Sequence, residues 1–255
     1  MAATLGLSPS ELALLLAPPL VYTCVYIPFC KYALGGRPRL ARLLLSLRLA
    51  HNLLLATFSL GMTLLAVAEL AHRPGLTPHS LLCSAARPMP AMVRAWYWSK
   101  FAEWVDSALL LAQGKPLGSL HYNHHATTAT VVASHFVGRS EAILARYDSR
   151  TSIFDVPLLL NAAVHTLMYT YYAAPKALRP LRKLITSAQI AQHVAVLFSI
   201  VYTSAVYFEG GAAACDISPA ANGLSLGLYG LYLVQFLSFY AVTYLKGGSS
   251  KSKVA

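Results

Sequence analysis

The stretch LHYNHHATTATVVASHFV, residues 120–137, decides how the rest of the chain is interpreted. Three of the nine histidines, His121, His124 and His125, fall within its first six residues. Their spacing of three and four places them on one face of a predicted helix. The remainder of the stretch, residues 126–137, carries no Asp, Glu, Lys or Arg, which favours a helix inside a membrane. Imidazoles are costly there, so the cluster indicates a functional site rather than structural histidines at a helix end.

The composition of the chain excludes an ordinary soluble protein. Of the 255 residues, 56% are hydrophobic and 11% are charged, against about 45–50% and 25% in soluble domains. The mean hydropathy is +0.54, so we predict an integral membrane protein. The formal charge of +11 favours anionic partners, either lipid headgroups or a substrate that bears phosphate. We expect no nucleic-acid partner.

Seven apolar stretches are long enough to be predicted as transmembrane helices. We therefore predict an all-α, polytopic fold with one domain over residues 1–255, whose segments 1–10 and 246–255 are loosely ordered. The first stretch lacks the basic start of a signal peptide and is interpreted as a retained helix, kinked by Pro18, Pro19 and Pro28. The predicted spans are residues 12–30, 43–70, 92–113, 120–137, 153–173, 184–208 and 223–245.

The distribution of Lys and Arg predicts the orientation of these helices. Basic residues gather after the first, third, fifth and seventh spans, which places these connections and the C-terminus in the cytosol and the N-terminus across the membrane. The connection after the fourth span opposes this orientation, because it holds Arg139, Arg146 and Arg150. The cytosolic set is Lys31, Arg37, Arg39, Arg42, Lys115, Lys176, Arg179, Arg182, Lys183, Lys246, Lys251 and Lys253.

Polar residues follow helical spacing in the cytosolic halves of four predicted helices. Ionisable groups at this depth must pair or face water, so a structural ladder of ion pairs in the third helix is one interpretation. The alternative is that the four stripes converge on one cavity that is open to the cytosol and apolar toward its closed end. The residues beyond the three histidines are Lys100, Glu103, Asp106, Asn161, His165, Tyr169, Tyr172, Gln189 and Gln192.

The order and spacing of these residues resemble the ELO family of very-long-chain fatty acid elongases. The family pattern K-x-x-E-x-x-D-T is similar to residues 100–107, and H-x-x-H-H matches residues 121–125. N-x-x-x-H-x-x-M-Y-x-Y-Y matches residues 161–172, and T-x-x-Q-x-x-Q matches residues 186–192. A final F-Y-x-x-x-Y matches residues 239–244. Departures are Ser107 for threonine, Asn123 for an aromatic, His193 for phenylalanine and Gln113 for arginine.

The resemblance implies a 3-ketoacyl-CoA synthase. Such an enzyme condenses a long-chain, in some members polyunsaturated, acyl-CoA with malonyl-CoA and releases CO2 and CoA, with no cofactor and no metal. Soluble condensing enzymes use a cysteine, but no cysteine is predicted in the cavity, so imidazole is the expected nucleophile. We assign the acyl-imidazole to His124, oriented by His121 and His125, and assign the malonyl thioester to His165. The polar stripes are expected to orient the imidazoles and bind pantetheine. Four basic residues would bind the CoA phosphates or merely set topology: Lys176, Arg179, Arg182 and Lys183.

The family also implies a location in the endoplasmic reticulum membrane, in contact with membrane lipid. The tail KSKVA, residues 251–255, fits a dilysine retrieval signal or a basic tail without further role. A homodimer, contacts with other enzymes of the elongation cycle, and the preferred acyl chain length are left open. Two competing functions are a di-iron desaturase or hydroxylase, which needs about eight imidazole ligands where this chain has one box, and a seven-helix transporter or receptor.

Two of the four cysteines are predicted to form a disulfide. Cys83 and Cys215 fall in connections on the lumenal side of the predicted topology, where disulfides persist. Cys24 and Cys30 belong to the first helix. The alternative is two unpaired loop cysteines, because a sequence does not fix the distance between their α-carbons.

Overall fold

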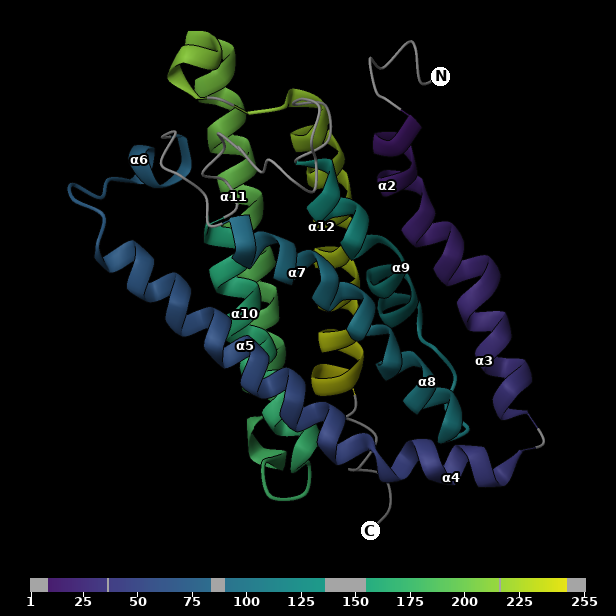
Figure 1. The fold of residues 1–255 in the computed structure, drawn as a ribbon. Helices are drawn as coiled ribbons and strands as arrows, with labels where there is room; N and C mark the ends of the chain where they lie inside the picture. The colour runs from purple at the N-terminus through teal and green to yellow at the C-terminus, as the bar shows by residue number, and fades with distance from the viewer. Residues whose placement is uncertain (1–8, 36, 84–89, 136–154, 216, 247–255) are drawn as a thin grey trace.

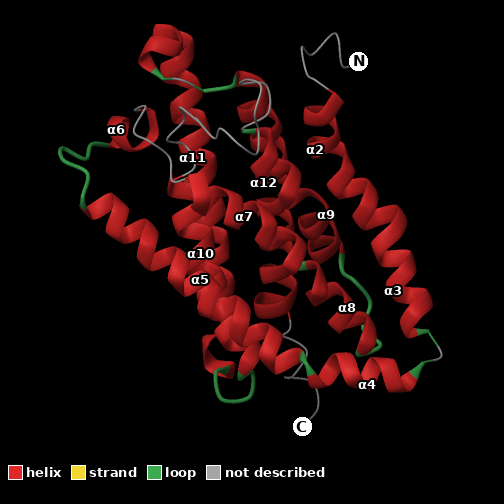
Figure 2. Cartoon of the chain, viewed as in Figure 1, coloured by secondary structure: helices red, strands yellow, loops and turns green. Residues whose placement is uncertain are grey.

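The computed structural model describes residues 9–35, 37–83, 90–135, 155–215 and 217–246, and all regular elements among them are helical (Figure 2). In chain order they are α2 (Pro9–Leu20), η1 (Val21–Tyr26), α3 (Ile27–Leu34), α4 (Pro38–Ser46), α5 (Arg48–Ala71), α6 (Pro78–Cys83), α7 (Pro90–Ala102), α8 (Trp104–Ala112), α9 (Ser119–Ser134), α10 (Asp155–Ala173), η3 (Arg179–Leu181), α11 (Arg182–Ala214), α12 (Pro219–Tyr240) and η4 (Ala241–Lys246). The basic tail, the three loop arginines and part of the fifth predicted span lie outside the described residues.

Four helical segments in the described residues are long and apolar enough to cross a membrane: Leu12–Leu34, Pro38–Ala71, Arg179–Ala214 and Pro219–Leu245. The chain is therefore a polytopic all-α membrane protein, while the count of seven spans stays a prediction. The third predicted span is divided between α7 and α8 at Glu103, and α9 has only 16 residues, which are about 24 Å of helix.

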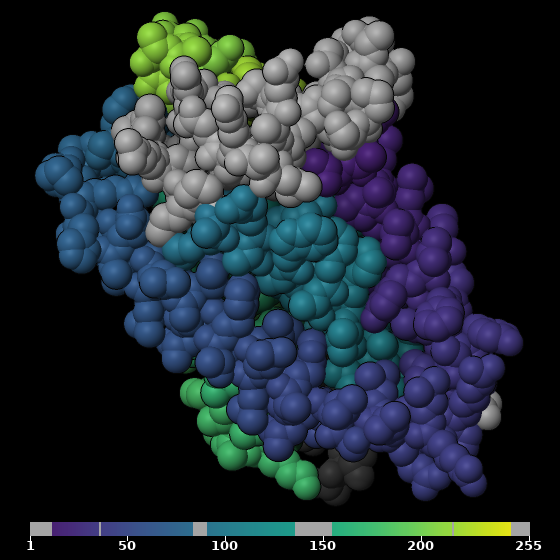
Figure 3. Space-filling model, viewed as in Figure 1, coloured from purple at the N-terminus to yellow at the C-terminus, as the bar shows by residue number. Residues whose placement is uncertain are grey.

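The helices form a bundle in which each long helix contacts its neighbours in a circuit. α5 packs on α10, α10 on α11, α11 on α12, and α12 on α9, which also contacts α7 (Figure 1). α5 lies diagonally across one face, beside the α7 and α8 segments (Figure 3). Many leucines on the outside of α5 are exposed, among them Leu54 at 69% and Leu64 at 60%. An apolar surface of this kind is expected to face lipid rather than water.

The first helix packs outside this circuit, against α9 and α8. A proline in it explains one of its hydrogen bonds to α9. Pro19 has no N–H to donate to the carbonyl four residues earlier, at Leu15. That carbonyl instead accepts a hydrogen bond of 2.8 Å from the Thr130 hydroxyl on α9. The carbonyl that Pro19 leaves without an intrahelical donor thus joins α2 to α9. The next residues, η1, form a wider π-helical turn instead of a simple kink.

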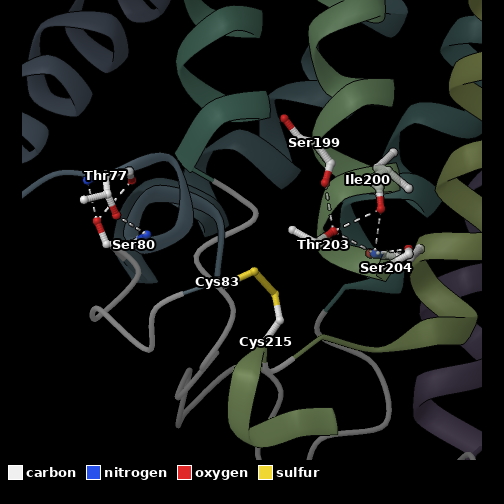
Figure 4. The surroundings of a disulfide bond; sticks show 9 residues. Thr77, Ser80, Cys83, Ser199, Ile200, Thr203, Ser204 and Cys215 are labelled. Atoms are coloured by element: carbon white, nitrogen blue, oxygen red, sulfur yellow. Dashed lines mark hydrogen bonds between the residues drawn. A yellow bond between two sulfur atoms is a disulfide. The ribbon is translucent and has the colours of Figure 1, made fainter. Parts of the chain in front are cut away.

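The two ends of the bundle differ in structure. One end, the disulfide end, holds Cys83 of α6 and Cys215, which follows α11 (Figure 4). An apolar core from α5, α7, α9 and α10 fills the bundle toward it. The opposite, C-terminal end holds α4, the α10–η3 turn and η4 (Figure 1). The sequence suggested that the closed end of the bundle is apolar. The structure shows that this half also contains buried polar residues. Buried Asn222 donates hydrogen bonds to Thr203 and Ser204, and His135 forms a hydrogen bond with Ser225.

Cys83 and Cys215 form the disulfide, which closes 132 residues of chain. Gly211, in the left-handed region at a φ of 68°, lets the end of α11 turn so that the chain reaches this contact. The loop-entropy relation gives a stabilisation of up to about 5 kcal/mol for a loop of this length. We therefore expect Cys83→Ser together with Cys215→Ser to lower the apparent Tm by many degrees.

Peptide mapping without reductant measures the bond itself. The Cys83 and Cys215 peptides are expected as one linked species. Recovery of both as separate alkylated peptides would show that the protein lacks the bond in solution. Cys24→Ser, at an exposed free cysteine, is the matched control and should leave the Tm unchanged.

Candidate active site

A cavity of about 680 Å³ lies inside the bundle and reaches the C-terminal end. Gly118, Pro175, Arg182 and Tyr244 line it at that end, where α9, α10, α11 and η4 start or finish. Deeper in the bundle it is lined by side chains from the predicted polar stripes. These are Glu103, Asp106, His121, His124, His125, Asn161, His165, Tyr172, Thr186, Gln189, Gln192 and His193. The structure therefore agrees with the prediction that polar residues from four helices converge on one cavity.

The three box histidines lie on one face of α9 and line this cavity. The rings of His121 and His125 lie with centroids 4.2 Å apart and are tilted by 40° to each other. The ring of His124 lies 5.7 Å from that of His125. His124 packs edge-on against Tyr232 of α12, at 5.0 Å. His121 is held by Ser107 of α8, whose Oγ is 2.8 Å from Nε2. The packing fixes the ring planes, while His124 Nδ1 is buried without a hydrogen-bond partner among the described residues.

A buried charge network connects α7 and α8 to α10. Lys100 Nζ donates to Glu103 Oε1 at 2.7 Å and to Asn161 Oδ1 at 2.9 Å. Trp96 donates to the same Asn161 oxygen, at 2.8 Å. His165 Nδ1 lies 3.4 Å from Glu103 Oε1. A carboxylate at this position favours the tautomer with its proton on Nδ1, which leaves Nε2 of His165 as a base or acceptor.

Lys100 and Tyr169, which the sequence placed among the substrate contacts, do not line the cavity. Lys100 is 2% exposed and acts on Glu103. Tyr169 is 1% exposed and donates to Asp106 Oδ2 at 2.7 Å. The other Asp106 oxygen lies 3.0 Å from His51 Nε2 of α5. Asp106 therefore joins α5, α8 and α10 at the cavity wall.

The fourth polar stripe lies on α11 and lines the same cavity. Gln189 donates to the Met168 sulfur at 3.5 Å, and Thr186 Oγ1 is 3.2 Å from the Tyr244 hydroxyl. His193 Nδ1 donates to the Gln189 carbonyl at 2.5 Å, and its ring packs on Phe236. Aromatic residues of α12 and η4 complete this wall. The cavity therefore has amide and hydroxyl groups near its mouth and aromatic rings beside His124.

A second hollow, of about 610 Å³, adjoins the mouth of the cavity. All four basic residues predicted to bind CoA phosphates line it, and Arg182 and Tyr244 line both spaces. The Arg182 guanidinium lies over the Tyr244 ring at 5.6 Å, and Lys183 lies over Tyr240 at 5.8 Å. The hollow is defined by Lys176, Ala177, Arg179, Pro180, Arg182, Lys183 and Tyr244.

Several residues at the site were not identified from the sequence. Tyr22, His51 and Tyr232 stand outside the motifs. Each reaches the site through a partner far along the chain: Tyr22 binds Ser107, and Tyr232 binds Thr127, at 2.5 Å. Neither free cysteine, Cys24 or Cys30, lines the cavity. Among the described residues no three His, Cys, Asp or Glu side chains are placed to hold a metal ion together.

Fold and site together define a class: helical membrane proteins with a histidine-lined internal cavity. Comparison with known proteins identifies the family within this class. The model of the ELO family, described as the GNS1/SUR4 family, matches residues 12–252. The chain therefore belongs to the ELO family.

Curated relatives support the same assignment. The chain is 30% identical to putative fatty acid elongase 2 of Schizosaccharomyces pombe, over 98% of this chain and 72% of that protein. It is also 30% identical to very long chain fatty acid elongase 6 of Drosophila melanogaster, over 79% of this chain and 64% of that protein. Fatty acid elongase 2 of Trypanosoma brucei brucei is likewise 30% identical, over 81% of this chain and 78% of that protein.

Proposed function

We propose that this protein is a fatty acid elongase and, more specifically, the 3-ketoacyl-CoA synthase that condenses a long-chain acyl-CoA with malonyl-CoA. The family assignment supports the general activity. The observation that supports the specific reaction is the cavity, which combines three box histidines with His165 and opens beside a basic hollow. Saturated and polyunsaturated chains are both included, because the aromatic rings beside His124 can pack against either.

In the first half-reaction, His124 is the nucleophile. A neutral imidazole nitrogen attacks the thioester carbonyl carbon, the C–S bond breaks, and CoA leaves as a thiolate. The thiolate takes up the proton that the other ring nitrogen of His124 releases. The acyl group remains as an acyl-imidazole. Two features support this assignment: His124 lies between His125 and Tyr232, and no free cysteine lines the cavity in the described residues.

In the second half-reaction, malonyl-CoA occupies the space that CoA has left. Loss of CO2 leaves an enolate, whose carbon attacks the acyl carbon. The C–N bond to His124 breaks, and the departing imidazole nitrogen takes up a proton from water. The product is 3-ketoacyl-CoA, which a ketone-reducing enzyme must consume. The Nδ1 atom of His165 lies beside Glu103. We assign two roles to the Nε2 atom of His165: when it carries a proton it donates to the malonyl thioester oxygen, and it can transfer that proton.

The basic hollow is proposed to bind the CoA phosphates. Its four cations lie at the mouth, where a pantetheine arm extending from His124 would leave the cavity. We expect Lys176→Glu with Lys183→Glu to raise the KM for acyl-CoA by about tenfold or more, because charge-assisted contacts to phosphate are lost. Added salt should shrink the difference. Initial rates at varied acyl-CoA measure the effect.

The matched substrate and variant controls are acyl-pantetheine and Lys31→Glu. Acyl-pantetheine lacks the phosphates, so its KM should not change in the double variant. Lys31 is exposed and lies outside the hollow, so Lys31→Glu tests net charge alone. An equal rise in KM for both substrates would show that the four cations do not bind phosphate.

We further propose that the protein resides in the endoplasmic reticulum membrane with its N-terminus lumenal and its C-terminus cytosolic. The cavity mouth and basic hollow share an end with η4, close to the C-terminus, and CoA substrates are cytosolic. The disulfide lies at the other end, where an oxidising lumen would preserve it.

Incubation of purified protein with acyl-CoA and labelled malonyl-CoA tests the proposed function. The expected products are one CO2, one free CoA and a 3-ketoacyl-CoA that is two carbons longer. A desaturated or hydroxylated acyl chain, or no condensation product with any long-chain acyl-CoA, would contradict it.

A further inference from the structure

Tyr22 lies outside the motifs and outside the cavity, but a chain of hydrogen bonds links it to the first box histidine. It is fully buried, at 0% exposure. Its hydroxyl oxygen lies 2.7 Å from Ser107 Oγ, and Ser107 Oγ lies 2.8 Å from Nε2 of His121. This relay joins η1, α8 and α9. Ser107 is also fully buried, so water does not compete for its hydroxyl.

The partners available to each group determine the direction of these hydrogen bonds. Within the described residues, Ser107 Oγ is the only hydrogen-bond partner of the Tyr22 hydroxyl. A buried phenol whose proton has no acceptor is unfavourable, so Tyr22 donates to Ser107. A hydroxyl has one proton, and that of Ser107 then goes to Nε2 of His121. The remaining proton of the neutral His121 ring must therefore be on Nδ1.

We propose that Tyr22 is a positioning residue that fixes the tautomer of His121, so that His121 presents an N–H donor to the thioester carbonyl oxygen. This inference rests on the proposed function. His121 lines the cavity, and its Nδ1 has no hydrogen-bond partner among the described residues. When His124 attacks the thioester, negative charge develops on the carbonyl oxygen. A donor prepared in advance stabilises that charge, whereas the opposite tautomer would present a lone pair.

The π-helical turn explains how Tyr22 comes to this position. η1 spans Val21–Tyr26, and in this wider turn the rings of Tyr22 and Tyr26 stack at 5.9 Å. Both also contact the Trp104 ring, at 5.2 and 5.3 Å. Their hydroxyls diverge: Tyr22 reaches Ser107, while Tyr26 donates to the Trp104 carbonyl at 2.9 Å. Turns of this type often occur at functional sites.

Tyr26 therefore provides a matched control for Tyr22. Tyr22→Phe keeps the ring and removes the donor to Ser107. Tyr26→Phe removes a similar hydrogen bond to the same helix, outside the relay. We expect Tyr22→Phe to lower kcat and the rate of CoA release by about tenfold with little change in the KM for acyl-CoA, and Ser107→Ala to lower them by about 100-fold. Ser107→Thr, which retains the hydroxyl, should keep most of the activity, and Tyr26→Phe should resemble the wild type.

A double variant separates the relay from general structural damage. If Tyr22 acts through Ser107, adding Tyr22→Phe to Ser107→Ala should cost nothing further. Multiplied losses, or equal losses in Tyr22→Phe and Tyr26→Phe, would overturn the proposal.

The tautomer can also be measured without turnover. Solid-state nitrogen NMR of histidine-labelled protein, with His121→Gln to identify the resonances, should show a proton on Nδ1 in the wild type and in Tyr26→Phe. A wild-type proton on Nε2 would overturn the relay even in an active enzyme. If no CoA is released by any variant but Nδ1 is protonated, the proposed reaction fails and the relay stands.

Discussion

His124→Ala is expected to abolish acyl transfer from acyl-CoA, lowering CoA release in the absence of malonyl-CoA by at least about 1,000-fold. Loss of a nucleophile removes the covalent route, whereas loss of a neighbouring donor only weakens it. Intact-mass spectrometry should detect an acyl adduct on the wild-type protein after incubation with acyl-CoA alone, and no adduct on the variant.

Two further variants make this result specific. His121→Ala should slow adduct formation without eliminating it, because His121 is assigned to stabilise charge. His193→Phe removes an imidazole from the same aromatic wall, where it packs on Phe236, and this variant should still be acylated. A His124→Ala protein that releases CoA and gains an acyl adduct would disprove the assignment, and an adduct mapped to His165 would transfer it there.

The second large effect is expected from the buried pair Lys100 and Glu103. Both are 2% exposed, so removal of one partner leaves an uncompensated charge inside the bundle. Lys100→Met and Glu103→Gln should each destabilise the protein by about 3–5 kcal/mol. Thermal unfolding in detergent, followed by tryptophan fluorescence, measures the change. Lys31→Met, which removes an exposed lysine, should have little effect.

The double variant Lys100→Met/Glu103→Gln distinguishes stability from function. With both charges gone, much of the lost stability should return. Activity should not return, because His165 would still lack the carboxylate 3.4 Å from Nδ1. If the double variant loses the sum of the two single effects, Lys100 and Glu103 do not act as a pair.

Local periodicity accounts for the parts of the site that the sequence predicted. The box histidines share a face because they belong to one helix, and His165, Gln189 and Gln192 line the cavity from α10 and α11 for the same reason. The helical class and the location of the basic hollow also follow from local patterns.

Long-range contacts account for the parts that the sequence did not predict. Tyr22 and Ser107 are 85 positions apart, and His51 and Asp106 are 55 apart. No spacing rule connects residues on separate helices. The motif at residues 100–107 forms as one helical stretch in the prediction, but the structure breaks it at Glu103, between α7 and α8. Lys100 donates to Asn161 and does not line the cavity. Buried Asn222 and His135 were likewise missed, because their partners lie on other helices.

The position of the disulfide sets an order of events during synthesis. Cys83 is made 132 residues before its partner. When Cys215 is added, α7 to α10 and all of α11 have already been translated. The bond therefore closes only after α8 to α11, which line the cavity, have been translated. Until that moment the Cys83 thiol can react with other disulfides. Under the proposed topology, a reducing agent present in the lumen during translation should thus affect newly made chains far more than mature ones, whose Cys83 and Cys215 are already buried.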